Sequence, residues 1–170
     1  MVFHANREKA NSLLNASGIK DAPVDLDKIA EILGFQIIPY PFPDQRNGMI
    51  IVEGNIKAIG VNQSHPPSRQ RYTIAHEIGH FVNGHEYYAP TTERKEILFY
   101  DHSFQQEREA DAFAAELLMP KHFLEKDLSE IGFDIPKLIE KYKVSEQAMR
   151  IRLVSLKLVE KYAVSKPLRI

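Results

Sequence analysis

Apolar and polar residues recur with two different periods along this chain, and these periods divide it into helical and extended stretches. Helix-compatible patterns cover residues 5–15 and 25–33, and each is followed by a glycine that can end a helix. Residues 35–38 form a short apolar run that stops at Pro39. Because proline cannot donate within a sheet interior, this run predicts an edge strand.

The clearest strand signal is a pair of apolar runs at residues 49–53 and 56–61, separated by Gly54-Asn55. Glycine and asparagine tolerate the backbone angles of a two-residue turn, so the pair predicts a β-hairpin. Together with the edge strand, the hairpin indicates a small antiparallel sheet.

Two longer helices are predicted after the hairpin. Ser68 is the expected N-cap of a helix that runs to about Asn83, where a glycine follows. Ser103 and Gln106 have the spacing of a capping box, which predicts a helix running to about Met119. The polar and aromatic stretch between the two, residues 85–102, has no clear period and is expected to be a loop. Further helices are predicted over residues 121–129, 136–143 and 146–159.

These elements predict an α+β fold with two parts. Residues 1–133 would form the core domain, and residues 134–170 a helical C-terminal extension packed on it. The chain of 170 residues, with 44% hydrophobic residues and a net charge of −1, suits a globule of this size. No stretch approaches the roughly 18 apolar residues that a membrane span needs, so we expect a cytoplasmic protein without a membrane partner.

The absence of cysteine narrows the possible chemistry. It excludes disulfide frameworks, thiolate metal sites and cysteine nucleophiles. Any metal must therefore bind to histidine and carboxylate side chains.

An HExxH motif, His76-Glu77-Ile78-Gly79-His80, lies within the predicted helix that ends near Asn83. Residues four apart lie one above the other on a helix, so both imidazoles can reach one ion. A neighbouring carboxylate, Glu77, can then serve as the general base of zinc-assisted hydrolysis. Two surface histidines on an amphipathic helix are the alternative, so a third ligand has to decide.

The third ligand is sought downstream. His85 follows His80 by five residues rather than the six of a metzincin, so we leave it outside the ligand set. A gluzincin takes a glutamate from a later helix, often with an acid four residues on, and Glu107 with Asp111 has this pattern. Glu130 and Asp134 share the spacing but bracket a glycine and precede a proline, which is not a helical context.

A helical wheel places Glu107 and Asp111 on the apolar stripe of their helix, with Phe104 on the same face and Glu109 and Glu116 opposite. Buried carboxylates are normally paired or metal-bound. Alanines on this face would let the HExxH helix approach closely. Glu107 could then complete a zinc site with His76 and His80, and Asp111 could accept a ring N–H from one of them. A salt bridge from these acids to Arg69, Arg71 or Arg108 is the structural alternative.

Two segments together resemble the ImmA/IrrE family of metallopeptidases: residues 69–85, RQRYTIAHEIGHFVNGH, and residues 106–120, QEREADAFAAELLMP. The resemblance implies a compact zincin-like domain, zinc on His76, His80 and Glu107, and Glu77 as the catalytic acid/base. It further implies a regulatory peptidase that cleaves a helix-turn-helix repressor, as in prophage, mobile-element or stress regulation. Some members are paired with repressors as toxin-antitoxin-like modules.

Two other functions stay open at this point. Residues 134–170 carry a local charge of +5, and the segment with Arg150 and Arg152 could form a helix-turn-helix. The protein would then be a DNA-binding regulator with a vestigial metal site, although direct nucleic-acid binding is the weaker expectation because no aromatic-basic cluster accompanies the charge. Alternatively, the chain could bind a repressor without cutting it, by strand addition.

Overall fold

The computed structural model describes residues 2–42, 46–85 and 103–163 of the chain. The expected loop over residues 85–102 lies almost wholly outside these ranges. The elements, in chain order, are α1 (Val2–Ser17), α2 (Leu26–Ile32), β1 (Gln36–Tyr40), β2 (Gly48–Glu53), β3 (Ile56–Asn62), α3 (Pro67–Asn83), α4 (Phe104–Leu118), α5 (Lys121–Ile131), α6 (Ile135–Tyr142), α7 (Glu146–Ser155) and α8 (Leu158–Ala163).

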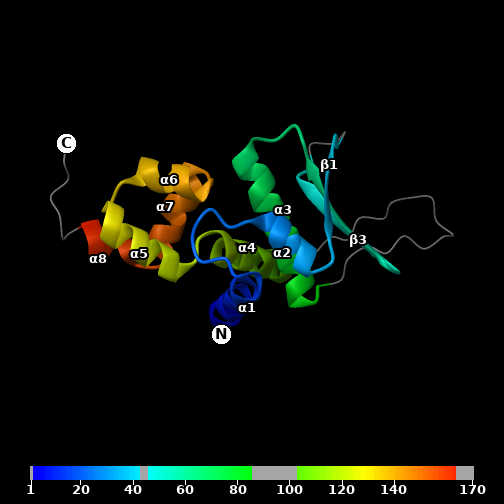
Figure 1. Ribbon diagram of the computed structural model, residues 1–170, viewed down its shortest axis with the longest axis horizontal. Coiled ribbons are helices and arrows are strands. Elements are labelled where there is room, and N and C mark those ends of the chain that lie inside the picture. The colour runs from blue at the N-terminus through cyan, green and yellow to red at the C-terminus, as the bar shows by residue number, and fades with distance from the viewer. Residues whose placement is uncertain (1, 43–45, 86–102, 164–170) are drawn as a thin grey trace.

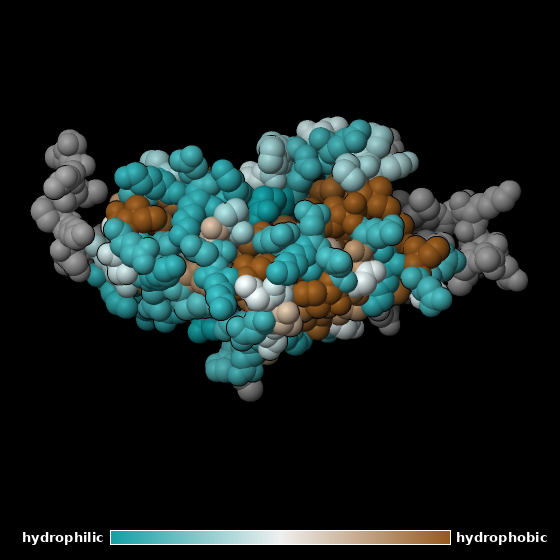
Figure 2. All heavy atoms as spheres, viewed as in Figure 1, coloured by the Kyte–Doolittle hydropathy of each residue, from teal (hydrophilic) through white to brown (hydrophobic). Residues whose placement is uncertain are grey.

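The protein has an α+β fold, with the sheet at one end and α5–α8 at the other (Figure 1). Helices α1, α3 and α4 lie between these ends, and α4 packs against both α3 and α1. A continuous apolar core joins the two ends, and its largest fully buried side chains include Ile59, Ile78, Phe113, Leu117 and Tyr142. Hydrophilic side chains cover most of the α5–α8 end on the face drawn in Figure 2.

The sheet is mixed, with the strand order β1-β3-β2. The predicted hairpin is confirmed: β2 pairs antiparallel with β3 across the turn at Gly54, whose φ is +56°. The expectation of an antiparallel sheet is wrong for β1, which pairs parallel with β3. β1 is an edge strand as predicted, and it continues through Pro39 because an edge strand tolerates a missing donor.

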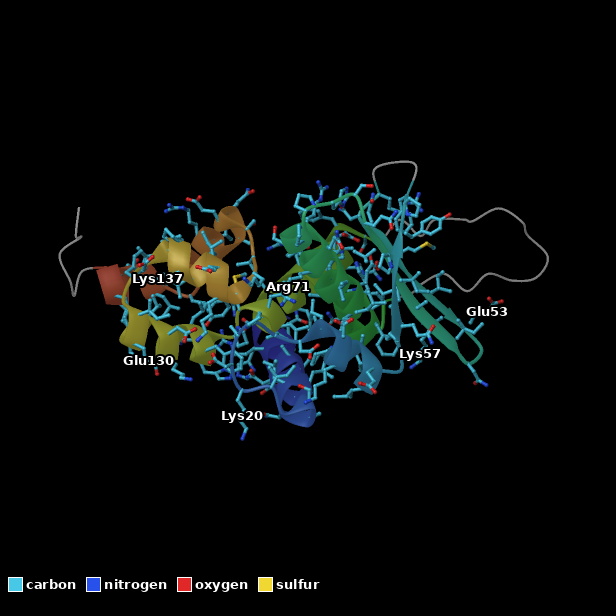
Figure 3. All side chains as sticks on the ribbon, turned by 45° about the horizontal axis from the view of Figure 1, so that its top comes forward. Lys20, Glu53, Lys57, Arg71, Glu130 and Lys137 are labelled. Carbon is cyan, nitrogen blue, oxygen red and sulfur yellow. The ribbon has the colours of Figure 1, made fainter. Side chains whose placement is uncertain are left out.

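The central strand is tied to the helices by a long polar side chain. Lys57 on β3 (Figure 3) donates from Nζ to the carbonyl oxygen of Leu33 at 3.1 Å, and its ammonium lies 4.8 Å from the ring centroid of Phe81 on α3. The N-terminal part of α3 is anchored by Arg71, whose guanidinium donates to the carbonyl oxygen of Val24 at 2.7 Å. These contacts fix α3 against both the sheet and α2.

Helix α3 begins at Pro67, so the prediction of Ser68 as its N-cap is wrong. Pro66 occupies the cap position and makes no side-chain cap hydrogen bond, while proline at the first helical position lacks a donor that would need one. The predicted end is confirmed, because Gly84 adopts the left-handed conformation with a φ of +70°. The capping box of Ser103 and Gln106 at the start of α4 is confirmed as well.

The predicted faces of α4 are wrong in part. Phe104 is 79% exposed, and the side chains of Glu107 and Asp111 are about half exposed rather than buried. Glu116, which the wheel assigned to the opposite face, is buried and forms a bidentate ion pair with Arg152 of α7, at 2.6 and 3.1 Å. Arg152 of α7 covers the C-terminal half of α4 from a second direction, so this half is buried on more than the face that contacts α3.

The C-terminal segment forms three short helices rather than two. The predicted helix over residues 146–159 is interrupted at Lys157, which has a φ of +57°, and α8 follows. Glu130 lies inside α5 and Asp134 is the N-cap of α6, so the first of these acids is helical, contrary to expectation. In the described parts of the chain, no helix combines the length and apolar character required to cross a membrane.

Candidate metal centre

Helix α3 holds the two histidines of the HExxH motif one turn apart on the side that faces α4. Their Nε2 atoms lie 2.9 Å from each other, and their ring centroids are 4.7 Å apart. The side chain of His80 is 2% exposed and that of His76 is 16% exposed. The imidazoles are therefore held in a protected position with both Nε2 atoms directed at one point.

Helix α4 brings Glu107 to the same point. Its two carboxylate oxygens each lie 3.3 Å from an imidazole, Oε2 from His76 Nε2 and Oε1 from His80 Nε2. All three potential ligand atoms fall within 4.8 Å of one another. The structure thus brings together His76, His80 and Glu107 as the sequence predicts.

This convergence depends on a close crossing of α3 and α4 at Gly79, which directly precedes His80. A Cβ at position 79 would lie 2.9 Å from the carbonyl oxygen of Ala110 and 3.1 Å from its Cα, a distance that real side chains do not tolerate without a shift. Ala110 and Ala114 are both fully buried, and Ala110 lies directly against Gly79. The predicted approach over the alanine face is therefore observed, with glycine as the partner that permits it.

The proton on His76 is located by its neighbours. Asp111 Oδ1 lies 2.9 Å from His76 Nδ1, and the same oxygen accepts a hydrogen bond of 2.6 Å from the Tyr72 hydroxyl. The hydrogen bond from His76 is the main reason that the pKa of Asp111 is lowered, with burial opposing and the Tyr72 bond assisting. An ionised carboxylate can only accept, so His76 Nδ1 carries a proton. In the neutral imidazole, Nε2 is then an open lone pair.

A second chain of contacts fixes His80. Its Nδ1 lies 3.0 Å from His85 Nδ1, and His85 Nε2 lies 3.1 Å from Glu109 Oε2. The pKa of Glu109 is lowered, mainly by the hydrogen bond from Gln105 and next by the one from His85. Its carboxylate therefore accepts from His85 Nε2. In the tautomer that has its proton on Nε2, His85 accepts at Nδ1, and His80 is then the donor there. With that pairing, His80 Nε2 is an acceptor directed toward His76 and Glu107.

The two Nε2 atoms and the Glu107 carboxylate face one another at 2.9 to 3.3 Å. Three acceptors at such distances repel unless a cation lies among them. Two neutral imidazoles and one carboxylate are a donor set typical of catalytic zinc, which keeps a fourth position open. The residues present therefore fit a metal, and this fit follows from the positions of the three side chains rather than from the motif alone.

Glu77, the remaining member of the motif, has an altered acidity. Burial raises the pKa of its carboxyl to about 7; His76 opposes this shift and the Glu107 carboxylate adds to it. A pKa close to neutral is the value at which a carboxyl group both accepts and returns a proton efficiently.

Sequence reasoning missed three side chains of this site: His85, Glu109 and Tyr72. The spacing places His85 outside the ligand set, and in the structure its ring contacts the Nδ1 atom of the predicted ligand His80. The sequence signal for His85 is the preceding Gly84, which ends α3 in the left-handed conformation. This turn brings the chain back, so that the His85 N–H bonds to the His80 carbonyl oxygen at 3.0 Å. None of the three side chains bonded to Asp111 or Glu107 within the described ranges is an arginine, so the salt-bridge alternative is not observed.

Among solved structures, one described as a Mycobacterium tuberculosis transcriptional regulator shares the fold, with a TM-score of 0.59 at 17% sequence identity. The match covers 88% of this chain and 46% of that one, so this chain spans less than half the length of that protein. No curated protein matches the chain.

A family model supplies the assignment. The model described as Peptidase_M78, IrrE N-terminal-like domain, matches residues 30–154, which is more than half of the chain and includes both α3 and α4. This range confirms the resemblance seen in the two sequence segments. The chain belongs to the IrrE N-terminal-like family of metallopeptidases.

Proposed function

We propose that this chain is a zinc-dependent endopeptidase whose substrate is a helix-turn-helix transcriptional repressor, and that cleavage relieves repression. The observation that carries the proposal is the convergence of the two imidazole Nε2 atoms with the Glu107 carboxylate, beside the Glu77 carboxyl group, whose pKa burial raises to about 7. His76, His80 and Glu107 would hold the zinc. The repressor is the finer part of the proposal and comes from the family resemblance.

The residues divide the work of peptide hydrolysis as follows. When bound, zinc supplies Lewis acidity, which activates water and polarises a peptide carbonyl. Glu77 accepts a proton from the attacking water and returns it to the leaving amine, so the carboxyl ends the cycle as it began. Asp111 and the His85–Glu109 pair keep both imidazoles in the tautomer that presents Nε2.

The test is incubation of the zinc-loaded chain with the repressor encoded beside its gene, followed by mass spectrometry of the products. We expect one reproducible cut that is absent with Glu77→Gln. Binding of the repressor without any fragment, at full zinc loading, would instead favour the strand-addition binder.

A DNA-binding function receives less support from the same region. Helices α6 and α7 follow one another through a short turn at residues 143–145. However, Arg152 is buried and donates to Glu116 and to the Met119 carbonyl oxygen, so it is not available to phosphate. Arg150 is exposed but paired with Glu146 of its own helix at 2.7 Å. Salt-sensitive gel-shift binding that survives His76→Ala would reverse this ranking.

The His85 contact gives a separate prediction for the metal. We expect His85→Ala to weaken zinc binding by about 10- to 100-fold, because His80 then loses the partner that orients its ring. Competition against a chromophoric chelator measures this affinity. His4→Ala is the matched control, since His4 is 76% exposed and contacts only Glu8 in α1 among the ion pairs found in the described residues. Equal affinities for the two variants would contradict the orienting role.

A further inference from the structure

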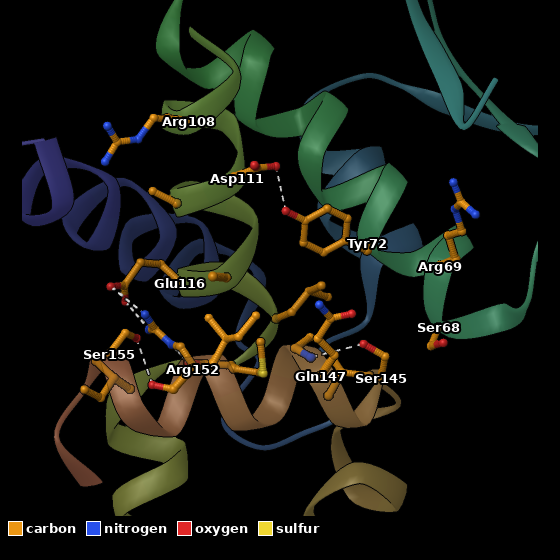
Figure 4. Close-up of a pocket in the computed structure, with 18 of the residues that line it drawn as sticks. Ser68, Arg69, Tyr72, Arg108, Asp111, Glu116, Ser145, Gln147, Arg152 and Ser155 are labelled. Carbon is orange, nitrogen blue, oxygen red and sulfur yellow. Dashed lines mark hydrogen bonds and ion pairs between the residues drawn. The ribbon is translucent and has the colours of Figure 1, made fainter. Parts of the chain in front are cut away.

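A groove of about 960 Å³ begins beside the candidate metal centre and runs between α4 and α7 (Figure 4). Tyr72 and Asp111 line one end, and their hydrogen bond is drawn there. Asp111 is also bonded to His76. A chain bound in the groove would therefore contact Asp111, which is itself bonded to the predicted ligand His76.

The walls of the groove are mainly apolar. α4 contributes the short side chains of Ala112 and Ala115, which leave its surface shallow, and α7 contributes Ala148 and Ile151. Ile151 is 61% exposed, an unusual degree for a large aliphatic side chain. A wide apolar channel between two helices is the shape that receives the apolar face of a third helix.

The charges available along this groove are positive. The two acids in its lining are already engaged, Asp111 with His76 and Tyr72, and Glu116 with Arg152. Arg69 and Arg108 stand exposed at the rim. Arg69 donates from Nε to the neutral Asn47 amide oxygen, and Arg108 lies 5.7 Å from the ring centroid of Phe104. Among the contacts found for the described residues, neither arginine is matched by a carboxylate.

We infer that this groove binds an amphipathic helix of the protein substrate, with its apolar stripe on Ile151 and Ala115 and its acidic residues toward Arg69 and Arg108. The inference rests on the proposed peptidase function, since it assigns the groove to that same site. A helix docked there holds the substrate by folded structure outside the bond to be cut. The neighbouring extended segment is then delivered to Glu77, so the groove would select the substrate by charge as well as by apolar pattern.

The test uses the zinc-loaded Glu77→Gln chain, so that binding is measured without cleavage. Two labelled peptides serve as probes, both with leucines at positions i, i+3, i+4 and i+7 of a helix. One carries glutamates beside the leucines and the other carries lysines at the same places. By fluorescence anisotropy, we expect the acidic peptide to bind at least about tenfold more tightly. Equal binding, or preference for the basic peptide, would overturn the inference.

Matched substitutions locate the binding. Ile151→Glu and Arg108→Glu are each expected to weaken the acidic peptide by about tenfold or more. Val154→Glu and Arg150→Glu are the controls, because Val154 is 65% exposed and Arg150 is exposed on the same helix, yet neither lines the groove. Losses as large in the controls would show binding elsewhere and refute the site. A change from monomer to dimer that is abolished by Ile151→Glu would identify a second copy as the occupant instead.

The repressor digest separates this inference from the proposed function. If the wild-type chain fails to cut the repressor while the acidic peptide still binds in the groove, the peptidase proposal fails and the binding surface stands. If the repressor is cut equally well by wild type, Ile151→Glu and Arg108→Glu, the peptidase stands and the groove has no part in substrate selection.

Discussion

Replacing Glu77 with glutamine is expected to lower the rate of peptide cleavage by about 10²- to 10⁴-fold, the usual contribution of a positioned general base. Glutamine matches the shape of glutamate but cannot accept the proton of the attacking water. Glu77 interacts electrostatically with His76 and Glu107 but is not one of the three side chains that converge on the candidate metal position. Zinc binding should therefore persist. Single-turnover cleavage with quantified zinc content measures both quantities.

The control for this variant is Glu31→Gln, which removes an exposed carboxylate from α2 far from the motif in the sequence. Its cleavage rate should equal that of the wild type. A Glu77→Gln chain that retains zinc and cuts at the wild-type rate would remove Glu77 from the mechanism. A chain that loses both zinc and activity would instead make it a structural part of the site.

The largest expected effect on stability comes from Arg152→Met. Its guanidinium pairs with Glu116, whose side chain is 3% exposed, and also donates to the Met119 carbonyl oxygen. Methionine has a similar volume, but among the described residues it leaves the buried carboxylate with only the longer contact of 3.5 Å to Arg7. Loss of one partner of a buried pair costs about 3–5 kcal/mol. Urea unfolding monitored by circular dichroism measures this free energy of unfolding.

Arg150→Met is the matched control, two residues along the same helix. Arg150 is 60% exposed and pairs with Glu146 within α7, a contact of the kind worth about 0.3–0.5 kcal/mol. Combining Arg152→Met with Glu116→Leu removes both charges and should recover much of the lost stability, because an apolar pair can replace a buried ion pair. If Arg152→Met were no less stable than Arg150→Met, the contact would not hold α4 and α7 together.

Local signals account for most of what the sequence predicted correctly. The hairpin turn, the glycine end of α3 and the capping box of α4 each depend on a few neighbouring residues, whose preferences hold in any fold. The HExxH spacing likewise needs only a helix. To predict Glu107 as the third ligand, one further pattern was needed, namely two acids four residues apart on a later helix. The structure brings Glu107 to the two histidines.

The errors arose where the answer depends on distant parts of the chain. A helical wheel assumes one buried face, but α4 meets α3 near its start and α7 near its end, so Glu107 is half exposed while Glu116 is buried. Strand direction has no local signature either, because a strand has the same period of two in a parallel and an antiparallel pairing. The parallel pairing of β1 with β3 therefore could not be predicted from the pattern of residues 35–38.

The unequal exposure of the three convergent side chains has a consequence for how an ion would come and go. His80 closes the inner side at 2% exposure, whereas Glu107 forms the outer side at 45%. A single rotation of one surface carboxylate would open the way to bulk water, with the crossing at Gly79 undisturbed. Occupancy would then track the free metal concentration around the folded molecule, and the site could be loaded or emptied repeatedly during the lifetime of the protein.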